Sequence, residues 1–214
     1  MLFNNRKDEP FNAWMSYTDL LSALTVLFIV VSVIIFNQWK SNLRNIISEY
    51  DEVFYEDELI QYEINRERGS IVITHKDTTK GLFAFGSDAM SDDFEGYVRK
   101  IGKPLVEKSM SIWEEQHLDD MEMRIEGHTD PLWKKAVNSD DAYINNLMLS
   151  SARANYVYKF IIDSLGLNES QKDFVKKNMI SIGYSYSKRL NEGNVDDRSK
   201  DASSRTIEFR IISK

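Results

Sequence analysis

The chain has one long uninterrupted apolar run near its N-terminus. Residues 20–36 carry no charged side chain, and this length approaches the roughly 20 residues that cross the hydrocarbon core of a bilayer. Trp14 and Trp39 frame the run, and their amphipathic rings favour the two headgroup regions of a membrane. The pattern predicts one transmembrane helix over residues 14–39, preceded by a short tail at residues 1–13.

We expect this helix to remain in the protein as a single-pass anchor. The apolar run is longer than the hydrophobic part of a typical secretory signal, and no Ala-x-Ala-like cleavage site follows it. Charge does not decide the orientation of the helix, because Arg6 and Lys7 precede it while Lys40 and Arg44 follow it.

The stretch that follows, residues 40–68, is amphipathic. Its apolar residues recur largely at spacings of three and four among many acids, which predicts one or two helices. These apolar positions are Leu43, Ile46, Ile47, Tyr50, Val53, Phe54, Leu59, Ile60 and Tyr62. Two roles are open for this juxtamembrane linker: a helix that dimerises or packs on the following domain, and a gate that lies over a pore.

Residues 69–214 alternate between strand and helix patterns. Strand patterns occupy residues 70–75, 121–130, 179–185 and 204–212. Helix patterns occupy residues 93–113 and 149–166. Their order along the chain is βαβαββ. We therefore predict an α+β protein whose soluble part is one domain of about 145 residues, an ordinary domain size.

Composition narrows the classes of function. The chain carries 34 acidic and 27 basic residues and no cysteine, which disfavours a nucleic-acid platform and removes disulfide and thiolate-metal chemistry. His75, His117 and His128 lack metal-ligand spacing, and no nucleophile-elbow or phosphate-loop motif occurs. We expect no enzyme, no metal site and no resident cofactor, and we expect His128 to be structural.

Asp19 is the one acidic residue inside the predicted span. An ionised group costs about 2.5–3.5 kcal/mol at the centre of a membrane helix on insertion scales, and less near the interface. One interpretation is an interfacial cap, because a helix N-terminus favours an anion. At about 100° per residue, however, Asp19 shares an arc of about 140° with hydroxyl residues that continue down the helix, namely Thr18, Ser22, Thr25 and Ser32.

This hydroxyl stripe favours a functional carboxylate. A capping acid needs no hydroxyls below it, whereas a carboxylate that faces a partner helix or a hydrated path benefits from them. We therefore expect an ion or proton site between helices, in which Ser22 and Thr25 assist hydration or coordination. One helix cannot enclose such a site, so a pore requires further membrane subunits around a dimer of this chain.

Several motifs in the C-terminal part resemble the OmpA-like peptidoglycan-binding domain. "IEGHTDP", "NLMLSSARANYVYKF", "IGYS" and "SRTIEFRI" follow the family's order of GHTD, N-x-x-L-S-x-x-R-A, G-Y and N-R-R-V-E-I. The resemblance implies that Asp130 and Arg153 together hold the amine and the carboxylate of the diaminopimelate in the wall's stem peptide. It also implies that Asn146 and Leu149 shape the pocket and that Thr129 supports Asp130.

Two departures from the family pattern affect this expectation. The segment between Asp130 and Arg153 is longer than usual, and the final N-R-R block reads Ser203, Ser204 and Arg205. Arg205 is therefore the one arginine of that block left to serve the pocket. The alternative interpretation is that Asp130 and Arg153 form an internal salt bridge between strand and helix, which contributes little if it is exposed.

The layout of the whole chain resembles the MotB-type stator family. Tyr17, Asp19 and Leu20 fit the family's Y-x-D-[LM] element, whose Asp carries the translocated proton or sodium ion. The resemblance implies a homodimer inside a ring of five multi-pass MotA/ZorA-like proteins in the bacterial inner membrane. It further implies a cytoplasmic N-terminus and a periplasmic domain bound to peptidoglycan.

Within that superfamily, the segment from Pro10 to Asp19 and the short linker most resemble the ZorB-type subunits of Zorya anti-phage defence systems. Two alternatives remain. A flagellar-type stator subunit usually has a longer linker and a more basic N-terminus. A passive peptidoglycan tether leaves Asp19 and its hydroxyl stripe unexplained.

Overall fold

The computed structural model describes residues 9–77, 79–116, 121–133, 137–187 and 204–213. The predicted tail at 1–13 therefore lies largely outside the described residues. The chain divides into two compact units, Met1–Asn42 and Leu43–Lys214. Each unit is described by itself below.

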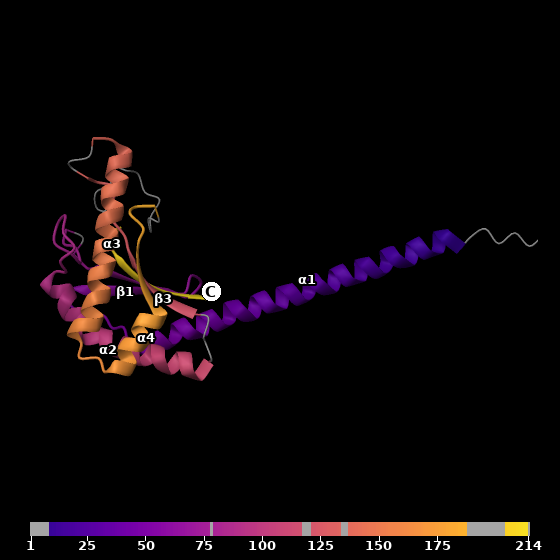
Figure 1. Cartoon of the computed structure of the whole chain (residues 1–214), viewed down its shortest axis with the longest axis horizontal. Helices are drawn as coiled ribbons and strands as arrows, with labels where there is room; N and C mark the ends of the chain where they lie inside the picture. The colour runs from indigo at the N-terminus through magenta and orange to yellow at the C-terminus, as the bar shows by residue number, and fades with distance from the viewer. Residues whose placement is uncertain (1–8, 78, 117–120, 134–136, 188–203, 214) are drawn as a thin grey trace, which may run out of the picture. The chain divides into compact units, whose positions relative to one another are not determined.

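The first unit consists of most of α1, an unbroken helix from Glu9 to Glu49 drawn in indigo in Figure 1. Every side chain from residue 14 to residue 39 is exposed. Among the described residues, one helical segment, Trp14–Glu52, is long and apolar enough by length and composition to cross a membrane. Its large exposed apolar surface is of the kind that contacts lipid or other membrane helices.

The second unit is an α+β domain built on one sheet, and the predicted fold class is confirmed. Its strands lie in the order β1-β2-β5-β3-β4; all neighbours run antiparallel except β3 and β4, which are parallel. In chain order the elements are η1 (Tyr50–Glu52), β1 (Ile60–Asn65), β2 (Ser70–His75), α2 (Asp92–Gln116), β3 (Met121–Gly127), α3 (Ser139–Ser164), α4 (Glu169–Asn178), β4 (Met179–Gly183) and β5 (Ile207–Ser213).

The core lies between one face of this sheet and the helices. Alternate residues of the inner strands point into it, because side chains along a strand alternate between faces. Those buried on this face include Ile71, Ile73, Met123, Ile125, Ile207, Phe209 and Ile211. Helices α2 and α3 supply the other side, with Val98, Ile101, Val157 and Ile161 among their buried residues.

Two glycines let α3 approach the sheet closely. A Cβ added to Gly127, the last residue of β3, would lie closer than 3.0 Å to the carbonyl oxygen of Ser150. A Cβ added to Gly183, the last residue of β4, would clash with the backbone nitrogen of Ser151 in the same way. Backbone therefore meets backbone here, and α3 is held directly beside the carboxyl ends of β3 and β4.

The linker at residues 40–68 differs from the expectation. Helix continues only to Glu49, with a short η1 after it, and the helical prediction is wrong for residues 60–65, which form β1. Ile60, Tyr62 and Ile64 alternate with polar residues, and all of β1 pairs with β2. This alternation of apolar and polar residues was not recognised as a strand, because apolar residues in the segment also recur at spacings of three and four.

The compact domain begins at Leu43, inside the stretch that the pattern assigned to a linker. Ile46, Ile47 and Tyr50 are buried in the domain core, and the Tyr50 hydroxyl is 3.0 Å from the Ser109 hydroxyl. Of the two roles considered for this stretch, packing on the domain therefore fits. A gate made from it would first have to leave the core.

Helix α4 was not predicted. Its signal is a capping box: the Asn168 side chain accepts from the Gln171 backbone, and the Gln171 side chain accepts from the Asn168 backbone. This reciprocal pair is readable as a helix start in sequence. The helix is short, and it lies between α3 and β4 in the chain.

Candidate functional site

A pocket with a volume of about 330 Å³ lies beyond the end of β3. Its lining residues are Phe85, Gly86, Thr129, Asp130, Leu132, Trp133, Asn146, Leu149, Arg153 and Arg205. All six residues that the sequence assigned to wall binding are among them. Their binding role stays a prediction, but the fold brings together groups that are up to 76 positions apart in the chain, from Thr129 to Arg205.

Backbone hydrogen bonds fix the loop after β3 that carries Thr129 and Asp130. The Thr129 backbone nitrogen donates to the carbonyl oxygen of Ser185 at 2.9 Å, and the backbone nitrogen of Leu132 donates to the Asp130 carboxylate at 3.0 Å. The second bond closes a local turn of the kind that Asp favours. Asp130 is thereby held at the pocket with its carboxylate partly engaged by its own loop.

Helix α3 supplies the opposite wall of the pocket. Asn146, Leu149 and Arg153 lie at spacings of three and four, which places them on one stripe of the helix. The start of α3 is fixed by Asn138, whose side chain accepts from the Asp141 backbone at 2.8 Å. The close contact with Gly127 then aims this stripe at the end of β3.

Arg153 is buried at the pocket and contacts two residues from the loop before α2. The side chain is 4% exposed, its Nε donates to the Ser87 carbonyl oxygen at 3.0 Å, and its guanidinium lies 4.9 Å from the centre of the Phe83 ring. Burial, followed by the nearby charge of Arg205, lowers the pKa of Arg153 to about 10. The group stays cationic at neutral pH, and an anion that enters the pocket relieves the repulsion.

Asp130 forms an ion pair with Arg205, whose Nε lies 3.2 Å from its carboxylate. Both side chains keep some exposure, 14% for Asp130 and 25% for Arg205. Among the described lining residues the formal charges are those of Asp130, Arg153 and Arg205, one negative and two positive. The pocket therefore offers both signs of charge, with a cationic excess.

Two further polar groups in the pocket wall point to a ligand. The Thr129 hydroxyl oxygen and the Asn146 amide nitrogen are buried and have no hydrogen-bond partner within the described part of the chain. A buried polar group without a partner costs about 1–3 kcal/mol. Water or a ligand in the pocket can satisfy both groups.

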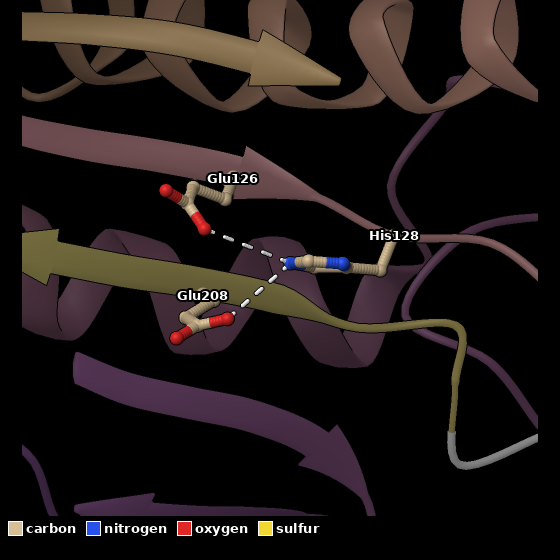
Figure 2. Close-up of side chains that lie close together, drawn as sticks. All are labelled: Glu126, His128 and Glu208. Carbon is tan, nitrogen blue, oxygen red and sulfur yellow. Dashed lines mark ion pairs between the residues drawn. The ribbon is translucent and has the colours of Figure 1, made fainter. Parts of the chain in front are cut away.

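Glu126, His128 and Glu208 form a buried cluster next to the loop that carries Thr129 (Figure 2). The two glutamates lie on the face of the sheet opposite the apolar core. Glu126 on β3 and Glu208 on β5 are directly opposite each other, an unfavourable position for two acids. The His128 Nε2 atom faces both, at 4.0 Å from Glu126 and 3.3 Å from Glu208, and Arg210 also contacts both carboxylates. Burial raises the pKa of Glu208, but its bonds to His128, Ser70 and Arg210 outweigh this and lower the pKa to about 2.

The potential ligand atoms of Glu126, His128 and Glu208 lie within 4.8 Å of one another, so this trio could hold a metal ion. The spacing in the sequence did not reveal it, because Glu208 comes from a distant strand. Arg210 already supplies a positive charge to both carboxylates, which makes the site poor for a second cation. We interpret the cluster as an ion-pair network that anchors the strand end next to Thr129.

The second predicted site lies on α1. Three of its residues, Asp19, Ser22 and Thr25, are each separated from the next by slightly less than one helical turn. Tyr17 lies on another side of the same helix. The Ser22 hydroxyl donates to the Thr18 carbonyl at 2.8 Å, and the Thr25 hydroxyl donates to the Leu21 carbonyl at 2.8 Å. Their ion-carrying roles stay predictions.

Four residues of the pocket were missed in the sequence: Phe85, Gly86, Leu132 and Trp133. Leu132 and Trp133 directly follow the GHTDP motif, so their place at the pocket was readable. Phe85 and Gly86 come from a loop before α2 that no motif marks. Their position follows only from the way the loop packs near Arg153, through the Ser87 carbonyl.

No family model matches this chain. It is similar to the Zorya protein ZorB of Escherichia coli (Crooks strain), at 22% identity over 97% of this chain and 90% of that protein. The resemblance expected from the sequence is confirmed. Similar solved structures include a MotB-like protein from Desulfovibrio vulgaris, at 14% identity and TM-score 0.46 over 83% of this chain and 93% of that one. Another is the periplasmic domain of Helicobacter pylori MotB, at 19% identity and TM-score 0.42 over 68% and 77%.

Proposed function

We propose that this chain is the wall-anchored, ion-carrying subunit of a ZorB-type membrane motor that acts in anti-phage defence. The observation that carries the proposal is the combination, in one chain, of a membrane-length helix whose residues 14–39 hold one carboxylate, Asp19, and a domain with a pocket of mixed charge. The similarity to ZorB supports it because it extends over 97% of the chain and so includes both parts.

The pocket chemistry suits the zwitterionic end of a wall peptide. An arginine fork binds a carboxylate through two parallel bonds, which suits Arg153, and an aspartate binds an ammonium group, which suits Asp130. Arg205 already pairs with Asp130, so an incoming amine competes with it. The released Arg205 can then join Arg153 at a ligand carboxylate, and Thr129 and Asn146 gain the partners that they lack.

The membrane helix suits the transport of a proton or a sodium ion. Asp19 alternates between an ionised and a loaded state as surrounding subunits expose it to each side of the membrane. The hydroxyl groups of Ser22 and Thr25 donate their protons to helix carbonyls. The lone pairs of their oxygens therefore remain available to a cation or water. A membrane potential of about 100 mV supplies about 2.3 kcal/mol per charge.

The remaining parts of the proposal follow from the resemblance to stator subunits. The chain forms a homodimer inside five copies of a multi-pass MotA/ZorA-like protein in the bacterial inner membrane. Its N-terminus is cytoplasmic, and its domain is periplasmic and bound to peptidoglycan. The chain is not an enzyme and carries no resident cofactor, since the transported ion is cargo.

A passive wall tether is the second candidate, because the pocket alone is sufficient for it. It leaves Asp19 without a purpose at a position where an apolar residue would cost less. The two candidates differ in what Asp19→Asn does: a tether keeps its function, and a motor loses it.

Pelleting of the full chain with purified cell wall tests the anchor. Arg153→Ala is expected to reduce the bound fraction at least about tenfold, because the variant loses a charge-assisted fork. Lys159→Ala, which removes an exposed cation from the same helix, is the matched control and should bind as the unmodified chain does. Equal pelleting of both variants would remove the support for the pocket.

A further inference from the structure

Ser185, two residues after the end of β4, has an unusual backbone conformation. Within the described ranges of the chain it is the one residue other than glycine with a positive φ, at 53°. In this left-handed region the Cβ of an ordinary residue crowds its own backbone, so glycine is the favoured occupant. Ser185 therefore carries a strain that glycine would avoid, and residues strained in this way cluster at functional sites.

The polar groups of Ser185 join the two walls of the pocket. The residue is fully buried. Its backbone nitrogen donates to the Ser150 hydroxyl at 2.9 Å, and its own hydroxyl donates to the Tyr143 carbonyl oxygen at 3.0 Å. Its carbonyl oxygen accepts from the Thr129 backbone nitrogen at 2.9 Å. One residue thus holds helix α3 on one side and the loop after β3 on the other.

The two contacts with α3 fix the part of the helix that carries the pocket residues. Tyr143 and Ser150 are seven positions apart, which is about two helical turns, so both lie on the same side of α3. Asn146 and Arg153 of the pocket follow these two residues by three positions each. Hydrogen bonds at two points along a helix resist both its sliding and its rotation, so the placement of Asn146 and Arg153 depends on Ser185.

The contact with Thr129 fixes the loop that carries Asp130. Beyond the paired strands β3 and β4, two further backbone bonds join the same segments: Tyr184 donates to the Gly127 carbonyl at 3.0 Å, and Thr129 donates to the Ser185 carbonyl at 2.9 Å. Asp130 is the next residue after the second bond. The position of its carboxylate therefore also depends on Ser185.

We propose that Ser185 is a positioning residue that sets the separation between the Asp130 carboxylate and the Arg153 guanidinium. It does not line the pocket, and it acts through the loop and the helix that carry these two groups. A ligand end with an ammonium and a carboxylate needs both partners at a matching distance, whereas a ligand with the carboxylate alone does not. The inference rests on the proposed wall binding, and it adds the residue that makes the pocket selective for a zwitterionic end.

Calorimetry on the full chain in detergent tests the proposal with two soluble probes. One is a stem peptide that ends in diaminopimelate with a free amine, and the other is the same peptide with that amine acetylated. The second probe keeps its carboxylate and loses its ammonium group. We expect the unmodified chain to bind the zwitterionic probe about tenfold more tightly, as one charge-assisted bond allows.

Ser185→Gly relieves the backbone strain and removes the hydroxyl bond to Tyr143. In this variant the preference for the zwitterionic probe should fall below about threefold, with the affinity for the acetylated probe unchanged. A smaller fraction of folded protein would reduce the binding of both probes equally. The ratio of the two affinities therefore reports the placement of the two charged groups and not the stability of the domain.

Ser187→Ala is the matched control, because its hydroxyl bonds at 2.7 Å to the Tyr184 carbonyl within its own loop; it should keep the full preference. A preference that persists in Ser185→Gly overturns the inference and leaves the wall binding intact. An equal fall in the binding of both probes makes Ser185 a purely structural residue and also overturns it. Equal binding of the two probes by the unmodified chain shows that the pocket does not recognise both charges, which overturns the inference as well. Failure of both probes to bind the unmodified chain overturns the proposed wall binding itself.

Discussion

The two candidate sites of this chain differ in where their polar groups find partners. On α1, the hydroxyl groups of Ser22 and Thr25 bond to carbonyls of their own helix. In the pocket, Asp130 and Arg153 are held by groups from distant segments, Arg205 and the Ser87 carbonyl. The domain therefore builds its pocket alone, whereas under the proposed function the membrane helix offers half of a site that other subunits would complete.

A site assembled by tertiary contacts is sensitive to the seating of its elements, and small shifts of α3 should damage it. A site carried on one helix depends on the identity of a few side chains and on what surrounds them. Substitutions around the pocket should therefore reduce the stability of the domain. Substitutions on the membrane helix should instead reduce ion transport.

The largest expected effect comes from Gly127→Ala, which breaks the seat of α3. The added methyl would collide with the Ser150 carbonyl, which is backbone and cannot move aside cheaply. We expect a loss of about 3–5 kcal/mol in the unfolding free energy of the domain, measured by urea unfolding of the full chain in detergent.

Gly96→Ala is the matched control for that change. Gly96 lies within α2, and a Cβ there would meet nothing within 4 Å. Alanine is the better helix former, so this variant should gain about 0.5–1 kcal/mol. Similar destabilisation by both substitutions would contradict the close backbone contact between β3 and α3.

An intermediate effect is expected from acid, through Glu208. Its pKa is lowered to about 2 from an ordinary value of 4.5, so its stabilising contribution is present above pH 4.5 and is lost as the pH falls towards 2. The difference corresponds to about 3 kcal/mol. Urea unfolding between pH 7 and pH 2.5 should therefore show a smaller loss of stability in Glu208→Gln than in the unmodified chain.

Glu63→Gln provides the comparison for Glu208, because Glu63 is exposed on β1. This variant should show the full acid-dependent loss. If Glu208→Gln loses stability in acid as steeply as Glu63→Gln does, the cluster around His128 is not an ion-pair network of the kind described above.

The smallest expected effect is on ion flux in Ser22→Ala. Ser22 lies one turn from Asp19, and its oxygen is one of several that can face the ion or water, so we expect a reduction of about threefold. Ser32→Ala removes the same group more than three turns away and should have no effect. Equal flux in both variants would limit the site to the carboxylate.

Much of the pocket could be predicted from sequence because its residues stand in motifs. Asp130 and Arg153 were identified from GHTD and from the helix pattern, and the fold places them in one hollow. Phe85 and the Glu126–Glu208 pair were not predicted, because their neighbours are set by long-range packing and strand register that local patterns do not encode. The strand β1 was missed since six residues fit two periods equally well.

The most direct test of the account is ion flux through vesicles that contain the full chain assembled with its multi-pass partner. The account predicts that Asp19→Asn abolishes flux and phage protection, while co-purification with the partner and pelleting with cell wall are retained. Undiminished flux in Asp19→Asn would contradict the account, and the chain would then be a wall tether whose membrane helix serves only as an anchor.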